Sequence, residues 1–194
     1  AGASEHDISM LSDNRTLMMV MRTDGDGKGY GCPAAAGRQP WHFYYQTYSQ
    51  DFGLTWSPPR PIPGAGSVRP RLLLLESGAL VMSGGRMCKA QAEQAPACLP
   101  TEQSSGGGVF LWVNADGMAD LGGERNGSEW VAHCVTAAHN RLWKGDPALL
   151  WTNTTGTQAY TSVVGLGANA VGVTYAHGEA LPDVATFMMR VDLG

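Results

Sequence analysis

The sequence is poor in charge: only 15% of its 194 residues are Asp, Glu, Lys or Arg, and the formal net charge is -4. The 13 Lys and Arg residues provide no basic patch for a phosphate backbone, so nucleic acid and anionic membrane surfaces are not expected partners. Disorder is not expected either, because 43% of the residues are hydrophobic. We therefore expect a folded protein with an apolar core.

Long hydrophobic runs and helical periodicity are missing as well. No run of about 18 apolar residues occurs, which predicts no membrane insertion. The first residues do not resemble a signal peptide, so we expect that a leader was removed or that the chain begins within a longer protein. The sequence has 26 Gly and 11 Pro between short runs of Val, Leu, Met and aromatic residues, which is typical of an all-β fold. The predicted strands are residues 6–11, 16–22, 41–48, 71–75, 79–83, 109–114, 161–166, 170–175 and 185–191.

Four cysteines and three Asn-x-Ser/Thr sequons suit an oxidising, glycosylating compartment and predict a secreted, lumenal or lysosomal glycoprotein. Cys88 and Cys98 bracket a polar insert and are predicted to close it as a disulfide, while Cys32 and Cys134 either pair or stay free. Four reduced thiols in a cytosolic protein are the alternative. The sequons begin at Asn14, Asn126 and Asn153.

Three segments share one design, in which an apolar strand, a short polar turn and a second apolar strand follow one another. They are EHDISMLSDNRTLMMVMR (5–22), RPRLLLLESGALVMSGGR (69–86) and YTSVVGLGANAVGVTYAH (160–177). These segments superpose within one residue and therefore form a repeat. Antiparallel sheets of about four strands that recur in this way are typical of propeller blades. We predict a single propeller fragment over residues 1–194, with blades at 5–62, 68–128 and 157–194 and an insert at 129–156.

The stretch SQDFGLTW (49–56) lies between two strand-like runs and carries turn-forming residues at every second position. The side-chain oxygens of Ser49 and Asp51 can accept hydrogen bonds from nearby backbone N–H groups, and Gly53 can adopt a positive φ. Trp56 is then placed to fold back over the hairpin and bury its ring. We predict a self-capped turn with Trp56 as its structural clasp.

This stretch resembles the Asp-box, or BNR repeat, of the sialidase (neuraminidase) superfamily, and it matches Ser-x-Asp-x-Gly-x-Thr-Trp at every consensus position. Through the three blade starts the resemblance covers most of the chain. It implies the C-terminal half of a six-bladed β-propeller, about three blades of four antiparallel strands, whose partner is the remaining half of the full-length chain. The same box is seen in propellers that are not sialidases, so it supports the fold better than the activity.

The repeat also predicts a cluster of side chains, because the innermost strands of a propeller line its axis and bring equivalent edges together. Superposition joins three inner-strand starts and three second-strand ends. They are Glu5, Arg69 and Tyr160, and Arg22, Arg86 and His177. Of the first group, we assign Arg69 to the strand entrance beside Pro70, with Arg71, and not to the site.

The resemblance implies a retaining, exo-sialidase-type glycoside hydrolase. Tyr160 would be its nucleophile and Glu5 the base that activates it, because a neutral phenol approaches a carboxylated sugar more easily than a carboxylate does. Arg22 and Arg86 would hold the carboxylate of the substrate through guanidinium N–H groups. Tyr175, on the strand after Tyr160, would also contact substrate.

The sequence departs from the family at several points, including Ala176-His177 after Tyr175, where the family often has an acidic residue. No residue before Glu5 can supply the acid that protonates the leaving group or the arginines of earlier blades, and SSGGGVFLWV (104–113) lacks another usual arginine. By itself the chain is therefore not expected to hydrolyse a glycoside. Two other functions stay open: a non-catalytic sialidase-like propeller that binds a glycan or a protein, and a hydrolase or lyase acting on a different anionic glycan.

The expected ligand is a sialylated or other anionic glycan, without a cofactor or metal. DGDGKG (24–29) resembles the opening of a calcium loop, but Ala35 occupies the twelfth position, where a bidentate carboxylate is needed. His133, Cys134 and His139 lack a fourth zinc ligand. Neither stretch is predicted to hold a metal ion.

Overall fold

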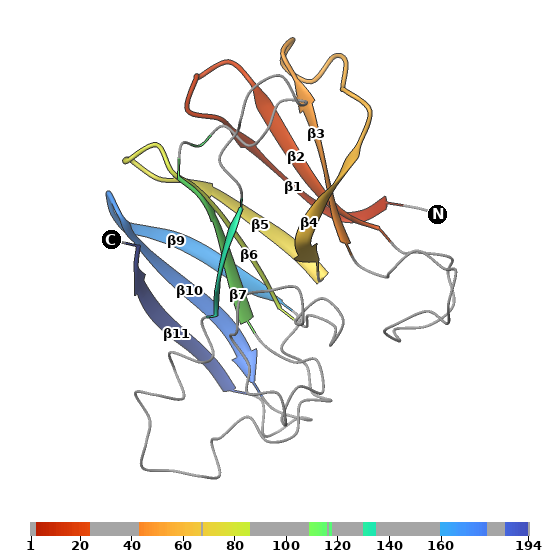
Figure 1. Cartoon of the computed structure of the whole chain (residues 1–194). Coiled ribbons are helices and arrows are strands. Elements are labelled where there is room, and N and C mark those ends of the chain that lie inside the picture. Colours follow the sequence, from red (N-terminus) through yellow and green to blue (C-terminus); the bar gives the residue numbers. More distant parts are fainter. Residues whose placement is uncertain are drawn as a thin grey trace, which may run out of the picture.

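The computed structural model describes residues 3–23, 43–66, 68–85, 109–115, 117, 130–134, 160–177 and 185–193. Within these ranges the protein is all-β, with eleven strands in three antiparallel sheets and no helix (Figure 1). No described helix is therefore long and apolar enough to cross a membrane.

Each sheet is a simple meander in which a strand pairs with its neighbours in the chain. The first sheet has the order β1 (Ala3–Met10), β2 (Leu17–Thr23), β3 (Phe43–Ser49) and β4 (Arg60–Gly66). The second has the order β5 (Val68–Leu74), β6 (Leu80–Gly85), β7 (Val109–Asn114) and β8 (Val131–Cys134). The third contains β9 (Thr161–Gly167), β10 (Ala170–His177) and β11 (Ala185–Asp192). This arrangement is that of propeller blades placed side by side.

The first hairpin shows why these residues form strands and a tight turn. Along β2, the side chains of Met18 and Val20 are fully buried and alternate with partly exposed neighbours, which is the period-two pattern of a pleated strand. In the β1–β2 turn, Asp13 Oδ1 accepts the backbone N–H of Arg15 at 3.0 Å and of Thr16 at 2.8 Å. The carboxylate thus satisfies donors that the turn takes out of the ladder.

Two apolar cores fill the spaces between the sheets. Between the first and second sheets, the rings of Tyr44 and Trp112 meet edge to face, with centroids 5.7 Å apart. Between the second and third sheets, branched residues of β6, β7 and β10 pack together, among them Val81, Leu111 and Val173. In consequence β1 packs against β5, and β5 against β9, so the first strands of the three sheets adjoin (Figure 1).

The stretch 49–56 folds into the predicted self-capped turn. Ser49 Oγ accepts the N–H of Gly53 at 2.8 Å, and Asp51 Oδ1 accepts that of Thr55 at 2.8 Å. Gly53 has a φ of 91°, and the indole of Trp56 donates to the Gly53 carbonyl at 3.1 Å. The turn is therefore held by its own residues.

The nine predicted strands are all present, and two further strands were not predicted. β4 carries Pro61 and Pro63, which argue against a strand in sequence, but it lies at the edge of its sheet, where proline is tolerated. β8 has only four residues and lies in the segment 129–156 that the sequence assigned to an insert, so the second sheet extends into that segment. The Cys88–Cys98 disulfide, Cys32, the sequons at Asn126 and Asn153, residues 24–29, His139 and Arg86 lie outside the described residues.

Candidate functional site

Glu5 occupies a β-bulge near the start of β1. Ser4 pairs with Arg22 and His6 with Met21 on β2, which leaves Glu5 as the extra residue between them. Its φ is 45°, a left-handed conformation that is uncommon for a residue with a side chain. A bulge changes the direction in which a side chain points, and such strained positions gather at functional sites. Here it brings Glu5 toward the neighbouring sheets.

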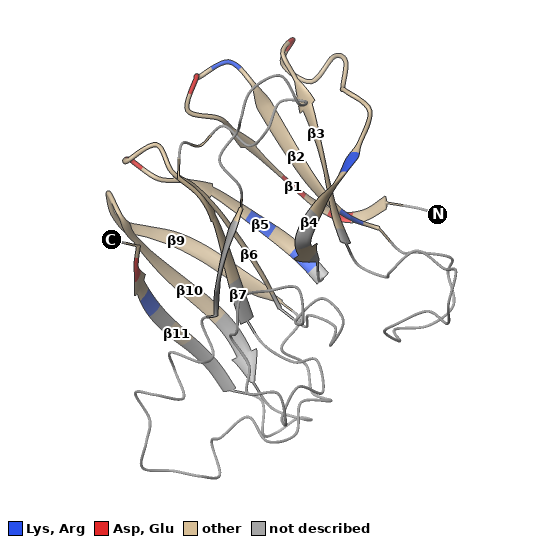
Figure 2. Ribbon diagram, in the orientation of Figure 1, with Lys and Arg blue, Asp and Glu red and all other residues tan. Residues whose placement is uncertain are grey.

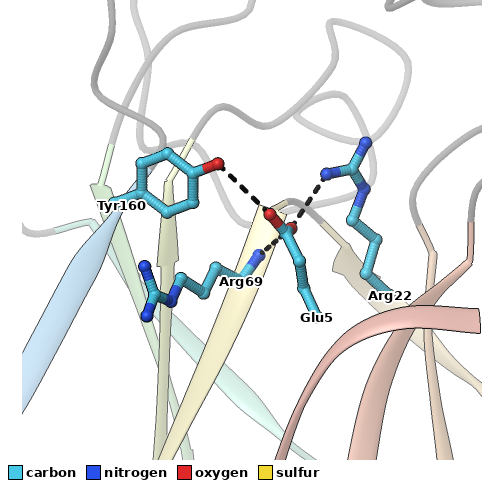
Figure 3. A network of polar contacts seen from close by, with 4 residues as sticks. All are labelled: Glu5, Arg22, Arg69 and Tyr160. Atoms are coloured by element: carbon cyan, nitrogen blue, oxygen red, sulfur yellow. Dashed lines mark hydrogen bonds and ion pairs between the residues drawn. The ribbon is translucent and has the colours of Figure 1, made fainter.

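Arg22, near the end of β2, forms an ion pair with Glu5 (Figure 3). The distance from Nη1 of Arg22 to Oε2 of Glu5 is 2.8 Å. The arginine side chain is 9% exposed and the glutamate side chain 24%, so the pair is shielded from water on the arginine side. Such a charge-assisted hydrogen bond fixes the direction of the carboxylate.

Tyr160, immediately before β9, reaches the same carboxylate from the third sheet. Its hydroxyl donates to Oε1 of Glu5 at 3.2 Å, across 155 residues of sequence (Figure 3). The tyrosine is 51% exposed, so its phenol is accessible from solvent. The adjoining first strands of the sheets make this contact possible.

Arg69 completes the cluster, although the sequence analysis left it out of the site. It sits in a second bulge, where Val68 pairs with Gly85 and Arg71 with Ser83, and its φ is 44°. Its backbone N–H donates to Oε2 of Glu5 at 2.9 Å, and its guanidinium carbon lies 5.3 Å from the centre of the Tyr160 ring. The signal was available in the repeat, which superposes Arg69 on Glu5 and Tyr160.

The carboxyl of Glu5 has a lowered pKa. Burial by itself raises this pKa, but the hydrogen bond from Arg22, the amide of Arg69, the charge of Arg22 and the Tyr160 hydroxyl together outweigh burial. Glu5 is therefore ionised at neutral pH and acts as a hydrogen-bond acceptor. Chemically, the arrangement places a carboxylate where it can receive the proton of an accessible phenol.

A second carboxylate on β1 anchors the neighbouring strand. Asp7 Oδ2 accepts the backbone N–H of Leu72 at 2.9 Å, and its Oδ1 lies 3.9 Å from Nη1 of Arg71. Between the second and third sheets, the buried hydroxyls of Ser83 and Thr161 are 2.8 Å apart. These contacts hold the three sheets in register around the cluster. Charged residues are sparse along the described strands, and the basic residues on β5 are Arg69 and Arg71 (Figure 2).

The side chains of the other two predicted site residues, Tyr175 and Arg86, lie outside what the structure describes, so their place relative to the cluster stays a prediction. Tyr175 lies on β10, where its backbone pairs with Thr161 and Phe187. Arg86 follows β6 and is outside the described residues. Among the residues that the structure describes, no group of three or more His, Cys, Asp or Glu could hold a metal ion.

Comparison with known proteins gives structural likeness only. No protein-family model and no curated protein matches the sequence. A crystal structure of a GH43_12 protein from a capybara gut metagenome is 13% identical over 99% of this chain, with a TM-score of 0.50. A protein of unknown function from Dyadobacter fermentans is 16% identical over 98% of this chain, with a TM-score of 0.49.

The chain spans only part of each similar structure: 29% of the length of the GH43_12 protein and 51% of that of the other. GH43 glycoside hydrolases are propellers, so the first likeness supports a propeller-like arrangement of the three sheets.

Proposed function

We propose that this chain is part of a propeller glycoside hydrolase of the sialidase type. Tyr160 is its nucleophile and Glu5 the base that activates it. The proposal depends above all on one observation, the 3.2 Å hydrogen bond from the Tyr160 hydroxyl to a Glu5 carboxylate that Arg22 also binds. A nucleophile within hydrogen-bond reach of a base, which is itself oriented by a third group, is the usual geometry of covalent catalysis.

The chemistry of an acidic sugar explains why a phenol would be used. A carboxylate nucleophile would be repelled by the carboxylate of the substrate, whereas a neutral phenol would not. In the first step, the Tyr160 oxygen bonds to the anomeric carbon, the bond to the leaving oxygen breaks, and the phenol proton passes to Glu5. This step inverts the anomeric carbon. Water then displaces Tyr160 with a second inversion at the same carbon, so the overall configuration is retained.

Several parts of the proposed enzyme are not among the side chains that the structure describes. The acid that protonates the leaving oxygen is assigned to the remaining half of a six-bladed propeller in the full-length chain. Arg86 and Tyr175 are proposed to contact a sialylated or other anionic glycan together with Arg22. The expected compartment is secretory, lumenal or lysosomal, where such glycans occur. The GH43_12 likeness supports a propeller glycosidase without distinguishing its substrate.

A non-catalytic propeller that binds a glycan or protein at the same place is the second candidate. The lowered pKa of Glu5 favours it, because a carboxylate that holds its proton weakly is a weaker general base. A hydrolase or lyase acting on another anionic glycan would use the same arginines, Arg22 and Arg86, and differ in the sugar that it accepts.

The test is hydrolysis of a fluorogenic sialoside by the full-length protein and by its Tyr160→Phe variant. Loss of the nucleophile is expected to lower kcat by about a thousandfold or more, with a much smaller change in KM. Tyr45→Phe, which removes a phenol hydroxyl on β3, is the matched control and is expected to leave kcat unchanged. A wild-type protein that binds the sialoside without cleaving it would favour the binding propeller.

A further inference from the structure

Two buried hydroxyls, those of Ser83 on β6 and Thr161 on β9, lie 2.8 Å apart between the second and third sheets. Their surroundings are apolar. Val81 lies on the same face of β6 as Ser83, and it belongs with Val173 of β10 to the core between these two sheets. A buried hydroxyl without a partner is costly, so each of the two stabilises the other there. The apolar contacts of this core do not by themselves call for a polar pair at this position.

The hydroxyl pair gives the third sheet a defined position against the second. Among the described strands β9 pairs only with β10, so its position against the second sheet is set by side chains and not by a backbone ladder. Apolar contacts have no preferred direction and tolerate small sliding movements. A hydrogen bond weakens steeply as its geometry changes. The bond between Ser83 and Thr161 therefore fixes where β9 begins relative to β6.

Tyr160 depends on this strand start for its own position. Its side chain is 51% exposed, so packing holds it only in part. The next residue is Thr161, which is buried, and whose backbone pairs with Tyr175 on β10. The placement of the phenol therefore follows from the placement of Thr161.

Ser83 also belongs to the sheet that anchors Glu5. In the ladder between β5 and β6, Ser83 pairs with Arg71, which directly follows the bulge. From that bulge the amide of Arg69 donates to Oε2 of Glu5 at 2.9 Å. The second sheet thus holds the carboxylate through β5 and the start of β9 through β6. A shift of β9 against β6 would change the 3.2 Å distance between the Tyr160 hydroxyl and Oε1 of Glu5.

We propose that Ser83 is a positioning residue for Tyr160. Acting through Thr161, its hydroxyl keeps the phenol within hydrogen-bond reach of the Glu5 carboxylate. The importance of this placement for catalysis rests on the proposed function, in which Tyr160 is the nucleophile and Glu5 its base. A displacement of a reacting group by about 1 Å can lower kcat by about a hundredfold, although no group that contacts substrate is lost.

The test compares Ser83→Ala, which removes the hydroxyl, with Val81→Ala, which removes apolar packing from the same face of the same strand. Tyrosine labelled with carbon-13 at Cζ is incorporated into the full-length protein, and the Tyr160 signal is identified by NMR from its loss in Tyr160→Phe. In Ser83→Ala this signal is expected to move toward its position in Glu5→Gln, because the hydrogen bond to the carboxylate is weakened. In Val81→Ala it is expected to stay at its wild-type position. Urea denaturation checks that Val81→Ala loses at least as much stability as Ser83→Ala.

Thr161 offers a second pair of variants, which decides the matter where Ser83→Ala does not fold. Thr161→Val keeps the shape of the side chain and removes the hydroxyl, whereas Thr161→Ser keeps the hydroxyl and removes a methyl group. With a fluorogenic sialoside, Ser83→Ala and Thr161→Val should lower kcat by about tenfold to a hundredfold with little change in KM. Thr161→Ser and Val81→Ala should keep kcat near the wild-type value, although both lose core packing.

The outcomes separate this inference from the proposed function. If the Tyr160 signal stays at its wild-type position in both Ser83→Ala and Thr161→Val, the inference is overturned, even where sialoside hydrolysis depends on Tyr160. An unchanged kcat in these two variants of an active enzyme overturns it as well, and so does an equal loss of kcat in Val81→Ala. If the signal moves in the two variants but the wild-type protein hydrolyses no sialoside, the placement of Tyr160 by Ser83 stands and the enzymatic function fails.

Discussion

The turn at residues 49–56 and the cluster around Glu5 are both organised by one carboxylate, but at very different distances along the chain. In the turn, the hydrogen bonds join residues no more than four positions apart. In the cluster, Glu5 meets partners 17, 64 and 155 positions away. The turn thus depends on its own residues, whereas the cluster exists only when all three sheets are packed together.

The two carboxylates also differ in surroundings. The pKa of Asp51 is lowered to about 2 by the hydroxyl and N–H of Thr55 and by the Ser49 hydroxyl, in a position open to solvent. Burial works against ionisation of Glu5, and its pKa is lowered by Arg22 on the same sheet, together with the Arg69 amide and the Tyr160 hydroxyl from the two other sheets. Disrupting the cluster should therefore affect the whole domain more than disrupting the turn.

The largest effect is expected for Glu5→Gln. This change leaves the buried charge of Arg22 without its counterion and should lower the free energy of unfolding by about 2–4 kcal/mol, which is reduced from the value for a fully buried pair because Glu5 is partly exposed. Urea denaturation at neutral pH measures it. Addition of Arg22→Leu should recover part of the loss, and a double variant that is no more stable than Glu5→Gln would contradict this explanation.

Two substitutions at left-handed positions should differ in their effect on stability. Gly53→Ala puts a side chain at a φ of 91° in the turn, and we expect a loss of about 1–2 kcal/mol from backbone strain. Arg69→Gly removes a side chain at a φ of 44° in the cluster, and stability should be retained or rise by up to about 1 kcal/mol. Thermal unfolding compares the two. A clear loss in Arg69→Gly would mean that its contact with Tyr160 outweighs the strain.

The smallest effect concerns the pH dependence of the turn. Because the pKa of Asp51 is lower in the folded protein than in the unfolded chain, its contribution to stability is complete above about pH 4 and is lost as the pH falls toward 2. Asp51→Asn should remove this dependence and flatten stability between pH 4 and pH 2, as followed by thermal unfolding in that range. An unchanged slope in the variant would assign the acid sensitivity to other carboxylates.

This contrast between local and distant partners explains which parts of the structure could be predicted from the sequence. The turn was predictable because every partner lies inside eight residues. Glu5, Arg22 and Tyr160 were found through the repeat, which converts distant positions into equivalent sheet edges. Their contacts are as the repeat predicted, while their catalytic roles stay a prediction.

What could not be predicted depends on geometry that leaves little trace in sequence. Arg69 was passed over because Pro70 beside it suggests only a strand entrance, and the bulge that directs it is visible only in the pairing of β5 with β6. The prolines of β4 argued against a strand, although this strand lies at a sheet edge. β8 has too few residues to show the alternation of apolar and polar side chains that predicts a strand. The six-blade count and the acid that protonates the leaving group are not tested by the three sheets that the structure describes.

Gly84, which faces the Tyr44–Trp112 contact, has a further consequence for how this protein can vary. A methyl group at position 84 would collide with the Tyr44 hydroxyl and come within 3.4 Å of the Trp112 ring. A methyl group at position 84 and the Tyr44 hydroxyl would thus occupy the same space. An alanine at 84 becomes tolerable only when that hydroxyl is removed, as in Tyr44→Phe. Among natural relatives, we expect these two sites, forty residues apart, to change in concert.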